Sequence, residues 1–186
     1  MYLEFAGSVH GRPPGLKLRR ATPEDAPSLS AIEVAAWRAA YHGLMPDAFL
    51  EGLSEAEKAE EWCRNLAKHC PFGRKRVLVA EAEAGPIGFV RVGASSEEAA
   101  GTGLVYLLDV LPGYWGLGVG KALMGAAMAE LRELGMREAA LWVLRENRRA
   151  RGFYEGLGWR PDGRTMEQEY GGARLQAWRY RRAVEV

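Results

Sequence analysis

Three glycines alternate with other residues between an apolar run and an amphipathic one, in the stretch LLDVLPGYWGLGVGKALM at residues 107–124. These are Gly116, Gly118 and Gly120, and a helical pattern follows them. A helix start leaves main-chain N–H groups without partners and favours an anion, and glycines let the backbone approach a phosphate closely. Lys121 adds a positive charge in the first turn. The stretch predicts a site for a phosphate-bearing cofactor; the alternative is an ordinary glycine-rich turn between a strand and a helix.

Spacing excludes two common phosphate-binding loops. A Walker loop requires glycine where Trp115 stands and serine or threonine where Ala122 stands. A dinucleotide fingerprint requires a third glycine three residues after Gly118, where Lys121 stands, and it closes the first strand of a βαβ unit. Here the preceding runs predict an antiparallel hairpin instead. What remains is Gly-x-Gly-x-Gly after a strand that ends in Val-Leu-Pro.

The order of apolar patterns predicts the fold class. Capping signals and helical or alternating periodicity give the order strand, two helices, three strands, helix, strand, helix, two strands. The last two strands flank Gly171 and Gly172, a hairpin signature. This order predicts an α/β chain (an α+β mixed sheet) with helices on both faces. Its 186 residues suit one core, so we expect residues 1–15 to be an N-terminal extension and residues 16–182 to be one domain.

The glycine stretch resembles the acetyl-coenzyme A motif of the GCN5-related N-acetyltransferase (GNAT) family, Arg/Gln-x-x-Gly-x-Gly/Ala. Gly118 and Gly120 match it, and Trp115 occupies the Arg/Gln position. Since the family's pyrophosphate contacts come mainly from main-chain N–H groups, we expect binding to persist and Trp115 to shield or restrict the site. The resemblance implies acetyl-coenzyme A as co-substrate, with no metal. The cofactor residues expected in this turn are Gly116, Leu117, Gly118, Val119, Gly120 and Lys121.

A second motif strengthens the resemblance. From Asn147 the sequence runs NRRARGFYEGLGW, which is similar to the family segment Asn-x-x-Ala-x-x-Phe-Tyr-x-x-x-Gly-Phe. The matching residues are Asn147, Ala150, Phe153, Tyr154 and Gly158, and Trp159 stands for the final phenylalanine. The resemblance covers the chain from Leu16 to Tyr180 in element order. It implies the GNAT acyl-CoA N-acyltransferase fold, a mostly antiparallel sheet with one parallel pair at the cofactor cleft.

The resemblance also implies roles for individual residues. Tyr154 is expected to protonate the departing thiolate or hold its sulfur, although its ring also suits packing of the helix on the sheet. Asn147 is expected to reach the pantetheine or the substrate, and its type also suits a helix cap. In the family the thioester lies in a V-shaped gap between the two parallel strands, next to main-chain N–H groups at a bulge expected near Val110. Leu108 and Asp109 join this cofactor neighbourhood.

Asp109 is the candidate general base. It is the one carboxylate in an apolar central strand, where an unpaired charge is costly unless it faces a cleft. Desolvation there raises the pKa of a carboxyl group and makes it a better base. The alternative is a paired aspartate that supports the bulge, and the sequence leaves both open.

The acceptor is expected to bind beside the first helices. The stretch AAWRAAYHGLMPDAFLEGL, residues 35–53, resembles a family subgroup marked by Trp-Arg-x-x-Tyr-x-Gly and Pro-x-x-Phe-Leu. The residues expected to line the acceptor pocket are Trp37, Arg38 and Tyr41, with His42 as a weaker candidate. Arg38 suits an acceptor that bears a carboxylate, and Trp37 equally suits core packing at helical spacing.

The implied function is transfer of an acetyl group from acetyl-coenzyme A to a primary amine of a small molecule or peptide, by direct attack in a ternary complex. The alternative is a noncatalytic coenzyme A-binding module. Cys63 and Cys70 precede the core strands and fit neither a zinc site nor an acyl-enzyme, so we expect reduced thiols. A net charge of +1 and the absence of long apolar runs predict a cytoplasmic protein with no nucleic-acid or membrane partner. A homodimer through the final hairpin is left open.

Overall fold

The computed structural model describes residues 13–67, 75–95 and 97–185. Within these ranges the strands form one sheet in the order β1-β2-β3-β4-β5-β7-β6. The strands are β1 (Lys17–Arg20), β2 (Lys75–Ala82), β3 (Gly85–Ala94), β4 (Thr102–Val110), β5 (Glu138–Leu144), β6 (Arg160–Tyr170) and β7 (Ala173–Ala183). The helices are α1 (Ala26–Tyr41), α2 (Asp47–Glu51), α3 (Glu55–Ala67), α4 (Val119–Glu133) and α5 (Arg148–Gly156), with 3-10 turns η1 (Pro23–Asp25) and η2 (Pro112–Tyr114). Each of these helices is too short or too polar to span a bilayer.

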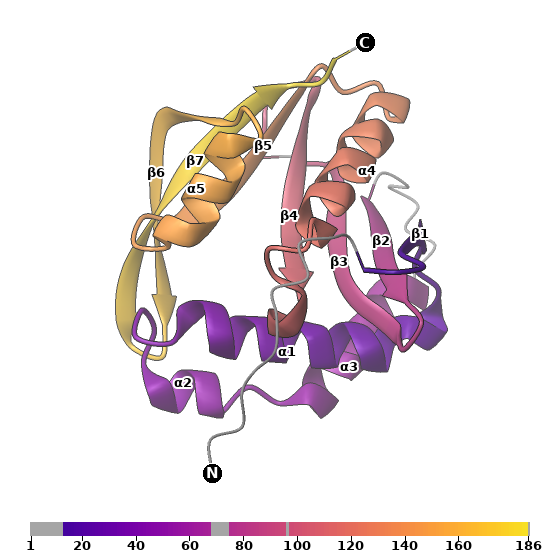
Figure 1. Ribbon diagram of the computed structural model, residues 1–186. Helices are drawn as coiled ribbons and strands as arrows, with labels where there is room; N and C mark the ends of the chain where they lie inside the picture. Colours follow the sequence, from indigo (N-terminus) through magenta and orange to yellow (C-terminus); the bar gives the residue numbers. More distant parts are fainter. Residues whose placement is uncertain (1–12, 68–74, 96, 186) are drawn as a thin grey trace.

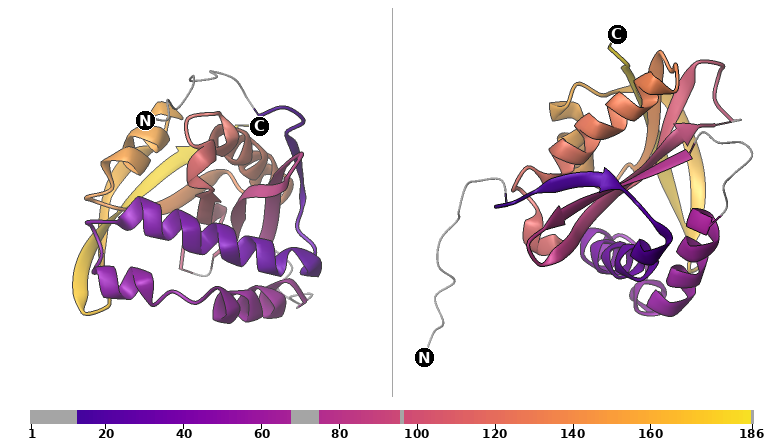
Figure 2. Two further views of the ribbon diagram at one scale, coloured as in Figure 1. Left: turned by 60° about the horizontal axis from the view of Figure 1, so that its bottom comes forward. Right: turned by 90° about the vertical axis from the view of Figure 1, so that its right-hand side faces the viewer.

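The sheet separates two layers of helices. Helices α4 and α5 cover one face, and α1, α2 and α3 cover the other (Figures 1 and 2). Strand pairs are antiparallel except β4 and β5, which are parallel. The predicted mixed sheet, with its single parallel pair and helices on both faces, is therefore confirmed.

Each face of the sheet has its own apolar core. Leu123 and Leu131 of α4 are fully buried with Trp159 and Tyr180 on one face. On the other face, Trp62 of α3 packs edge-to-face on Phe89 of β3, with ring centroids 5.1 Å apart. Burying a side chain of this size contributes roughly 1.5–3 kcal/mol, so both layers are held firmly to the sheet.

Local sequence signals account for the helix starts. The main-chain N–H of Thr22 donates to Oδ2 of Asp25 over 2.8 Å, which closes η1 directly before α1. The N–H of Glu57 donates to Oγ of Ser54 at 3.3 Å in the first turn of α3. Cys70 and most of the expected N-terminal extension lie outside the described residues.

The two predicted hairpins are present. Gly171 and Gly172 connect β6 to β7 with φ angles of +56° and +85°. These left-handed conformations explain why the sequence has two glycines there. The other hairpin joins β2 to β3, where Ala82 pairs with Gly85.

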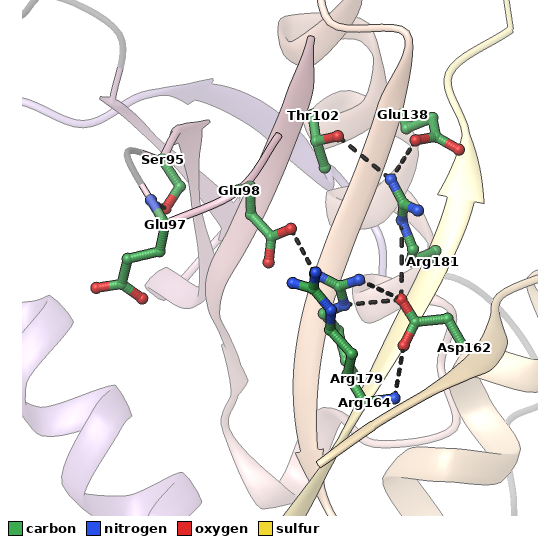
Figure 3. Close-up of polar contacts among 9 residues, drawn as sticks. All are labelled: Ser95, Glu97, Glu98, Thr102, Glu138, Asp162, Arg164, Arg179 and Arg181. Carbon is green, nitrogen blue, oxygen red and sulfur yellow. Dashed lines mark hydrogen bonds and ion pairs between the residues drawn. The ribbon is translucent and has the colours of Figure 1, made fainter. Parts of the chain in front are cut away.

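A buried group of charged side chains holds the strands together at the N-terminal ends of β4 and β5 (Figure 3). Arg179 of β7 is only 4% exposed and lies between two carboxylates, at 2.6 Å from Glu98 and 2.5 Å from Asp162. Arg181, two residues along, donates to Thr102 at the start of β4 and pairs with Glu138 at the start of β5. These contacts keep β4 and β5 side by side at this end of the sheet.

Candidate active site

Strands β4 and β5 are paired only at their beginnings. The parallel register runs from the pair Thr102 and Glu138 to the pair Val105 and Leu141. Beyond that point β4 continues to Val110 against β3 alone, while β5 stays against β7. The two strands therefore separate toward their carboxyl ends (Figure 1), and the expected V-shaped gap opens between them.

A bulge at Tyr106 marks the point where β4 leaves β5. The register with β3 shifts between Arg91 and Val92, which leaves Tyr106 as the extra residue of β4. Pairing with β5 ends at Val105, the residue before it. An extra residue increases the twist of a strand and interrupts its ladder, so the bulge turns β4 away from its parallel neighbour. The expectation that the bulge lies near Val110 is wrong.

The main chain of Val110 faces the gap. The N–H of Leu111 donates to the carbonyl of Ile87 in β3 over 2.9 Å. Since the polar groups of successive residues in a strand point to opposite sides, those of Val110 point away from β3. Its carbonyl accepts a hydrogen bond from the indole N–H of Trp115 at 2.7 Å.

The glycine turn leads into the N-terminus of α4 as the sequence predicts. Gly116 and Gly118 have φ angles of +78° and +79°, and no atom lies within 4 Å of a Cβ built on either. Glycine is therefore required at these two positions by the left-handed backbone conformation, which other residues adopt at a cost in free energy. The first N–H of α4 to bond back along the chain is that of Ala122, to Gly118. The preceding N–H groups are available to an anion.

Gly120 has a different reason to lack a side chain. A Cβ there would lie 3.2 Å from Cζ of Phe153, so the glycine allows α5 to approach the first turn of α4. The glycine motif and the Asn-x-x-Ala-x-x-Phe-Tyr motif thus meet in space. The sequence shows both motifs but gives no sign of this contact.

A cavity of about 710 Å³ lies where the two motifs meet the gap. Its volume is in the usual range for sites that bind small molecules and cofactors. The lining side chains and glycines come from the end of β4, the glycine turn and α5. They are Leu108, Val110, Tyr114, Trp115, Gly116, Gly118, Gly120, Lys121, Arg149, Ala150, Phe153, Tyr154, Gly156 and Leu157.

Seven of the residues expected at the cofactor line this cavity: Leu108, Val110, Gly116, Gly118, Gly120, Lys121 and Tyr154. Four do not. Val119 is fully buried in the core beneath α4, and Leu117 is outside the lining, so only their main chains lie along the turn. Asn147 and Asp109 are the other two, and both have specific surroundings.

Asn147 caps α5. Its Oδ1 accepts a hydrogen bond from the main-chain N–H of Ala150 at 3.0 Å, and the residue is 7% exposed. This contact uses the side chain to satisfy one of the orphan donors of the helix start. Of the two roles expected for Asn147, the cap is the one present in the structure.

Tyr154 of α5 lines the cavity. Its ring packs edge-to-face against Phe153 and Trp159, with centroids 5.2 and 6.3 Å away. Burial raises the pKa of its hydroxyl, and the nearby charge of Asp109 raises it further. The hydroxyl therefore keeps its proton at neutral pH.

Asp109 lies on the opposite face of β4 from the cavity-lining Leu108 and Val110. Its partner in β3 is Phe89, whose side chain belongs to the core beneath α1 and α3. Oδ2 of Asp109 is buried and has no hydrogen-bond partner among the described residues. Burial raises the pKa of this carboxyl group well above its usual value, and the negative charge of Glu33 adds to the effect.

In the described part of the chain, Oδ2 of the Asp109 side chain has no hydrogen-bond partner, and no side-chain hydrogen bond contributes to its pKa shift. This disfavours the alternative of a paired aspartate that supports the bulge. Its charge acts on Tyr154 toward the cavity and on Tyr41 of α1. Asp109 thus lies between the cavity lined by Tyr154 and the layer of helices expected to bind the acceptor.

The sequence did not single out four of the residues that line the cavity: Tyr114, Arg149, Gly156 and Leu157. The guanidinium of Arg149 stacks on Trp115, 3.2 Å from the ring centroid. Desolvation lowers the pKa of Arg149, and interaction with Tyr41 opposes this shift. Its place between Asn147 and Ala150 of the second motif was a usable signal for this residue.

The expected acceptor residues are only partly brought together. Trp37 and Tyr41 pack edge-to-face with centroids 5.2 Å apart, and Trp37 also contacts Tyr170. Burial raises the pKa of the Tyr41 hydroxyl. His42 is exposed in the turn after α1. Trp37 also lines a second cavity on this face of the sheet.

Arg38 does not face an acceptor. It donates hydrogen bonds to the main-chain carbonyls of Leu50, Glu51 and Leu53, at 2.9 to 3.1 Å. These carbonyls lie at the C-terminal end of α2, where a positive charge is favourable. The structure therefore corrects the expectation for Arg38, because its guanidinium holds α2 against α1.

Sequence comparison identifies similar acetyltransferases. Over 147 residues the chain is 35% identical to mycothiol acetyltransferase of Propionibacterium freudenreichii subsp. shermanii, which covers 78% of this chain and 43% of that protein. It therefore spans less than half the length of this relative. It is 29% identical to an uncharacterised N-acetyltransferase, YuaI, of Bacillus subtilis, over 70% of this chain and 72% of that protein.

Solved structures share the fold. PaiA N-acetyltransferase of Thermoplasma acidophilum, in complex with coenzyme A, is 20% identical with a TM-score of 0.71, covering 88% of this chain and 98% of that one. Ribosomal-protein-alanine N-acetyltransferase of Brucella melitensis is 22% identical with a TM-score of 0.69, covering 90% and 99%.

A family model described as "Acetyltransferase (GNAT) family" matches residues 35–159, more than half of the 186-residue chain. This range includes both the glycine turn and the Asn147 motif. The chain belongs to the acetyltransferase (GNAT) family.

Proposed function

We propose that this protein transfers an acetyl group from acetyl-coenzyme A to a primary amine of a small molecule or peptide, by direct attack within a ternary complex. The observation that carries the proposal is the position of Asp109 and Tyr154 at the separation of β4 and β5. The Tyr154 hydroxyl belongs to a residue that lines the cavity, together with the glycines at the N-terminus of α4. The carboxylate of Asp109, whose Oδ2 has no partner among the described residues, lies on the opposite face of β4. Family membership and the acetyltransferase names of the relatives support acetyl transfer.

The residues present fit coenzyme A. The open left-handed turn at Gly116 and Gly118 offers main-chain N–H groups to a diphosphate, and Lys121 adds a positive charge. The apolar side chains of Leu108, Val110 and other lining residues suit the pantetheine arm. The resemblance of this fold to a structure crystallised with coenzyme A supports the same assignment.

In the proposed reaction the neutral amine attacks the thioester carbonyl. A bond forms between the amine nitrogen and the acetyl carbon, and the bond between that carbon and sulfur breaks. Asp109 accepts the proton that the amine loses, and the Tyr154 hydroxyl donates a proton to the departing thiolate. Main-chain N–H groups of β4 that face the gap, such as that of Val110, stabilise the negative charge on the carbonyl oxygen.

Direct attack is favoured over an acyl-enzyme because, among the described residues, no cysteine lines the cavity. Cys63 is exposed on α3, on the other side of the sheet. A covalent route through a thiol would require a nucleophile within reach of the thioester.

Initial-rate kinetics test the proposal. The full chain is incubated with acetyl-coenzyme A and a panel of primary amines, while release of free thiol is measured and the N-acetylated product is identified by mass spectrometry. With both substrates varied, direct attack predicts intersecting double-reciprocal lines. Parallel lines would indicate an acyl-enzyme, and binding of acetyl-coenzyme A without thiol release on any amine would indicate a noncatalytic module.

A further inference from the structure

A second cavity lies on the face of the sheet that carries α1 and α3. Its volume is about 290 Å³, close to the lower end of ligand pockets, so it suits a molecule of amino-acid size. Residues of α1, α3, β3 and β4 line it: Glu33, Trp37, Lys58, Glu61, Trp62, Asn65, Arg91, Tyr106 and Leu107. Neither motif in the sequence pointed to this cavity, and of its lining residues only Trp37 was expected at an acceptor site.

The charges in this cavity are unequally compensated. Glu33 is 4% exposed and fully engaged, with Lys58 at 2.9 Å and the indole N–H of Trp62 at 2.8 Å. Lys58 also reaches Glu61 at 3.3 Å. Among the residues that the structure describes, Arg91 has no carboxylate partner. Arg91 is therefore the positive charge in this cavity that remains available to a ligand.

Aromatic rings hold Arg91 in place. Its guanidinium carbon lies 6.0 Å from the ring centroid of Trp62 and 5.6 Å from that of Tyr106. The Tyr106 hydroxyl donates to the carbonyl of Ala94 at 2.7 Å, which fixes the ring at the bulge. A guanidinium between two aromatic faces keeps its planar donors directed outward, as a site for a carboxylate requires.

The cavity and Asp109 share one face of the sheet. In the β3–β4 register Arg91 pairs with Leu107, and Asp109 lies two residues further along β4. Diagonal neighbours of this kind are about 7–8 Å apart in a sheet, within reach of a long side chain. The charges of Glu33 and Lys58, which line the cavity, also act on Asp109. Asp109 does not itself line the cavity, so a molecule bound to Arg91 would reach it by extending two residues along the same face of β4.

We propose that this cavity is the acceptor site and that it selects primary amines that carry a carboxylate, with the carboxylate on Arg91 and the amine directed toward Asp109. The inference rests on the proposed function. It moves the carboxylate-binding role expected of Arg38, which is bound to the carbonyls of α2, to a residue of β3 at the bulge. Since Arg91 binds the carboxylate and thereby directs the amine toward Asp109, amines that lack a carboxylate are poor acceptors.

Matched pairs of substrates test the inference on the unmodified protein. Glycine, β-alanine, 4-aminobutyrate and a dipeptide are each compared with the corresponding carboxamide. We expect kcat/KM to be about 10- to 100-fold higher for at least one free acid than for its amide, the effect of one hydrogen-bonded ion pair. The amine of the carboxamide is less basic, so a larger fraction of it is neutral and able to attack. This difference favours the amide and therefore acts against the expected result.

Substitution of Arg91 then assigns the effect. Arg91→Met should raise KM for the free acid by about tenfold or more, with little change for the amide or for acetyl-coenzyme A, and Arg91→Lys should restore part of the loss. Arg64→Met, which removes an exposed arginine of α3 outside the cavity, is the control. Equal rates for acids and amides would overturn this inference alone. Binding of acetyl-coenzyme A without acetylation of any amine would overturn the proposed function as well.

Discussion

The indole N–H of Trp115 donates a hydrogen bond to the main-chain carbonyl of Val110 over 2.7 Å. Trp115 occupies the Arg/Gln position of the family motif, and the guanidinium of Arg149 stacks on its ring. The residue thus ties the turn before α4 to the end of β4. The expectation that Trp115 would shield or restrict the site fits its place in the cavity lining, and the anchoring contact adds a role.

Trp115→Phe is expected to keep the stacked ring but lose the hydrogen bond, at a cost of about 1 kcal/mol in the free energy of unfolding. Trp115→Ala also frees the turn and should raise KM for acetyl-coenzyme A by about tenfold, the equivalent of 1.4 kcal/mol. Urea unfolding and initial rates measure the two effects. Trp178→Phe is a matched control, because Trp178 also has an indole hydrogen bond and a stacked arginine, Arg151, but lies outside the cavity lining. An unchanged KM for Trp115→Ala would refute the anchoring role.

Tyr154→Phe removes a hydroxyl and leaves the ring contacts with Phe153 and Trp159. If the hydroxyl protonates the thiolate, kcat should fall by about 10²-fold, at the low end of general acid catalysis, while KM for acetyl-coenzyme A changes little. Steady-state rates of thiol release measure this. Tyr170→Phe, which removes a hydroxyl beyond the cavity lining, should keep its kcat. A Tyr154→Phe variant with full kcat would exclude the tyrosine as the acid.

Asp109→Asn should lower activity and raise stability. Because the folded protein raises the pKa of Asp109, it binds a proton more tightly than the unfolded chain does. Asp109 thus costs stability as pH rises from the unfolded pKa, about 3.9, toward the folded pKa, and the cost stays constant above it. Removing the ionisable group should therefore stabilise the protein at pH 8 and have little effect at pH 3.5.

Urea unfolding of Asp109→Asn and the unmodified protein at both pH values measures this difference. The pH profile provides the kinetic counterpart, since kcat/KM of the unmodified protein should rise as Asp109 loses its proton and the variant should lack this rise. A variant that is less stable at pH 8, or that has an unchanged profile, would contradict the assignment of Asp109.

The charged group around Arg179 is expected to be essential for stability (Figure 3). Arg179→Met leaves Glu98 and Asp162 without their shared partner, and breaking a buried ion pair in this way costs about 3–5 kcal/mol. Urea unfolding measures the loss. Arg64→Met removes an exposed pair with Glu60 and should cost less than about 1 kcal/mol. Equal costs for the two variants would show that the buried group adds nothing specific.

The same group should make the protein sensitive to acid. Burial raises the pKa of Asp162, but hydrogen bonds from Arg179 and from the N–H of Arg164 outweigh this and lower it below the usual value. A group with a lowered folded pKa stabilises the protein above its unfolded pKa, and that contribution is lost as pH falls through the folded pKa. Asp162→Asn should therefore have a lower free energy of unfolding than the unmodified protein at pH 7. The two values should approach each other below about pH 3. A constant difference across this range would contradict the ion-pair explanation.

Local signals in the sequence, together with the family resemblance, predicted most of the fold and the elements that line the larger cavity. Periodicity and capping residues predicted the element order except for the short helix α2, Asp47–Glu51. The family resemblance of two motifs implied that the turn around Gly118 and the helix with Tyr154 belong to one site. The reason is that each of these signals depends on neighbours a few residues apart. Both elements contribute to one cavity in the structure.

The acceptor side was less predictable because it depends on contacts between distant segments. Arg38 reaches the carbonyls at the end of α2, which no spacing rule anticipates. The bulge at Tyr106 arises from the register between β3 and β4, so its place could not be read from the apolar pattern of one strand. The alternation of apolar and polar residues in β3 predicts only that the Arg91 side chain is polar. The cavity that it lines becomes visible only when α3 places Trp62 beside it.

Titration calorimetry of the full chain with acetyl-coenzyme A tests the central claim most directly, which is that the N-terminus of α4 and its glycine turn bind the diphosphate of this co-substrate. The account predicts saturable one-site binding with Kd below about 1 mM, in the usual range of substrate affinities. It also predicts weaker binding by Gly118→Ala, because alanine disfavours the backbone with φ of +79°. No saturable heat with the folded, unmodified protein would contradict the account.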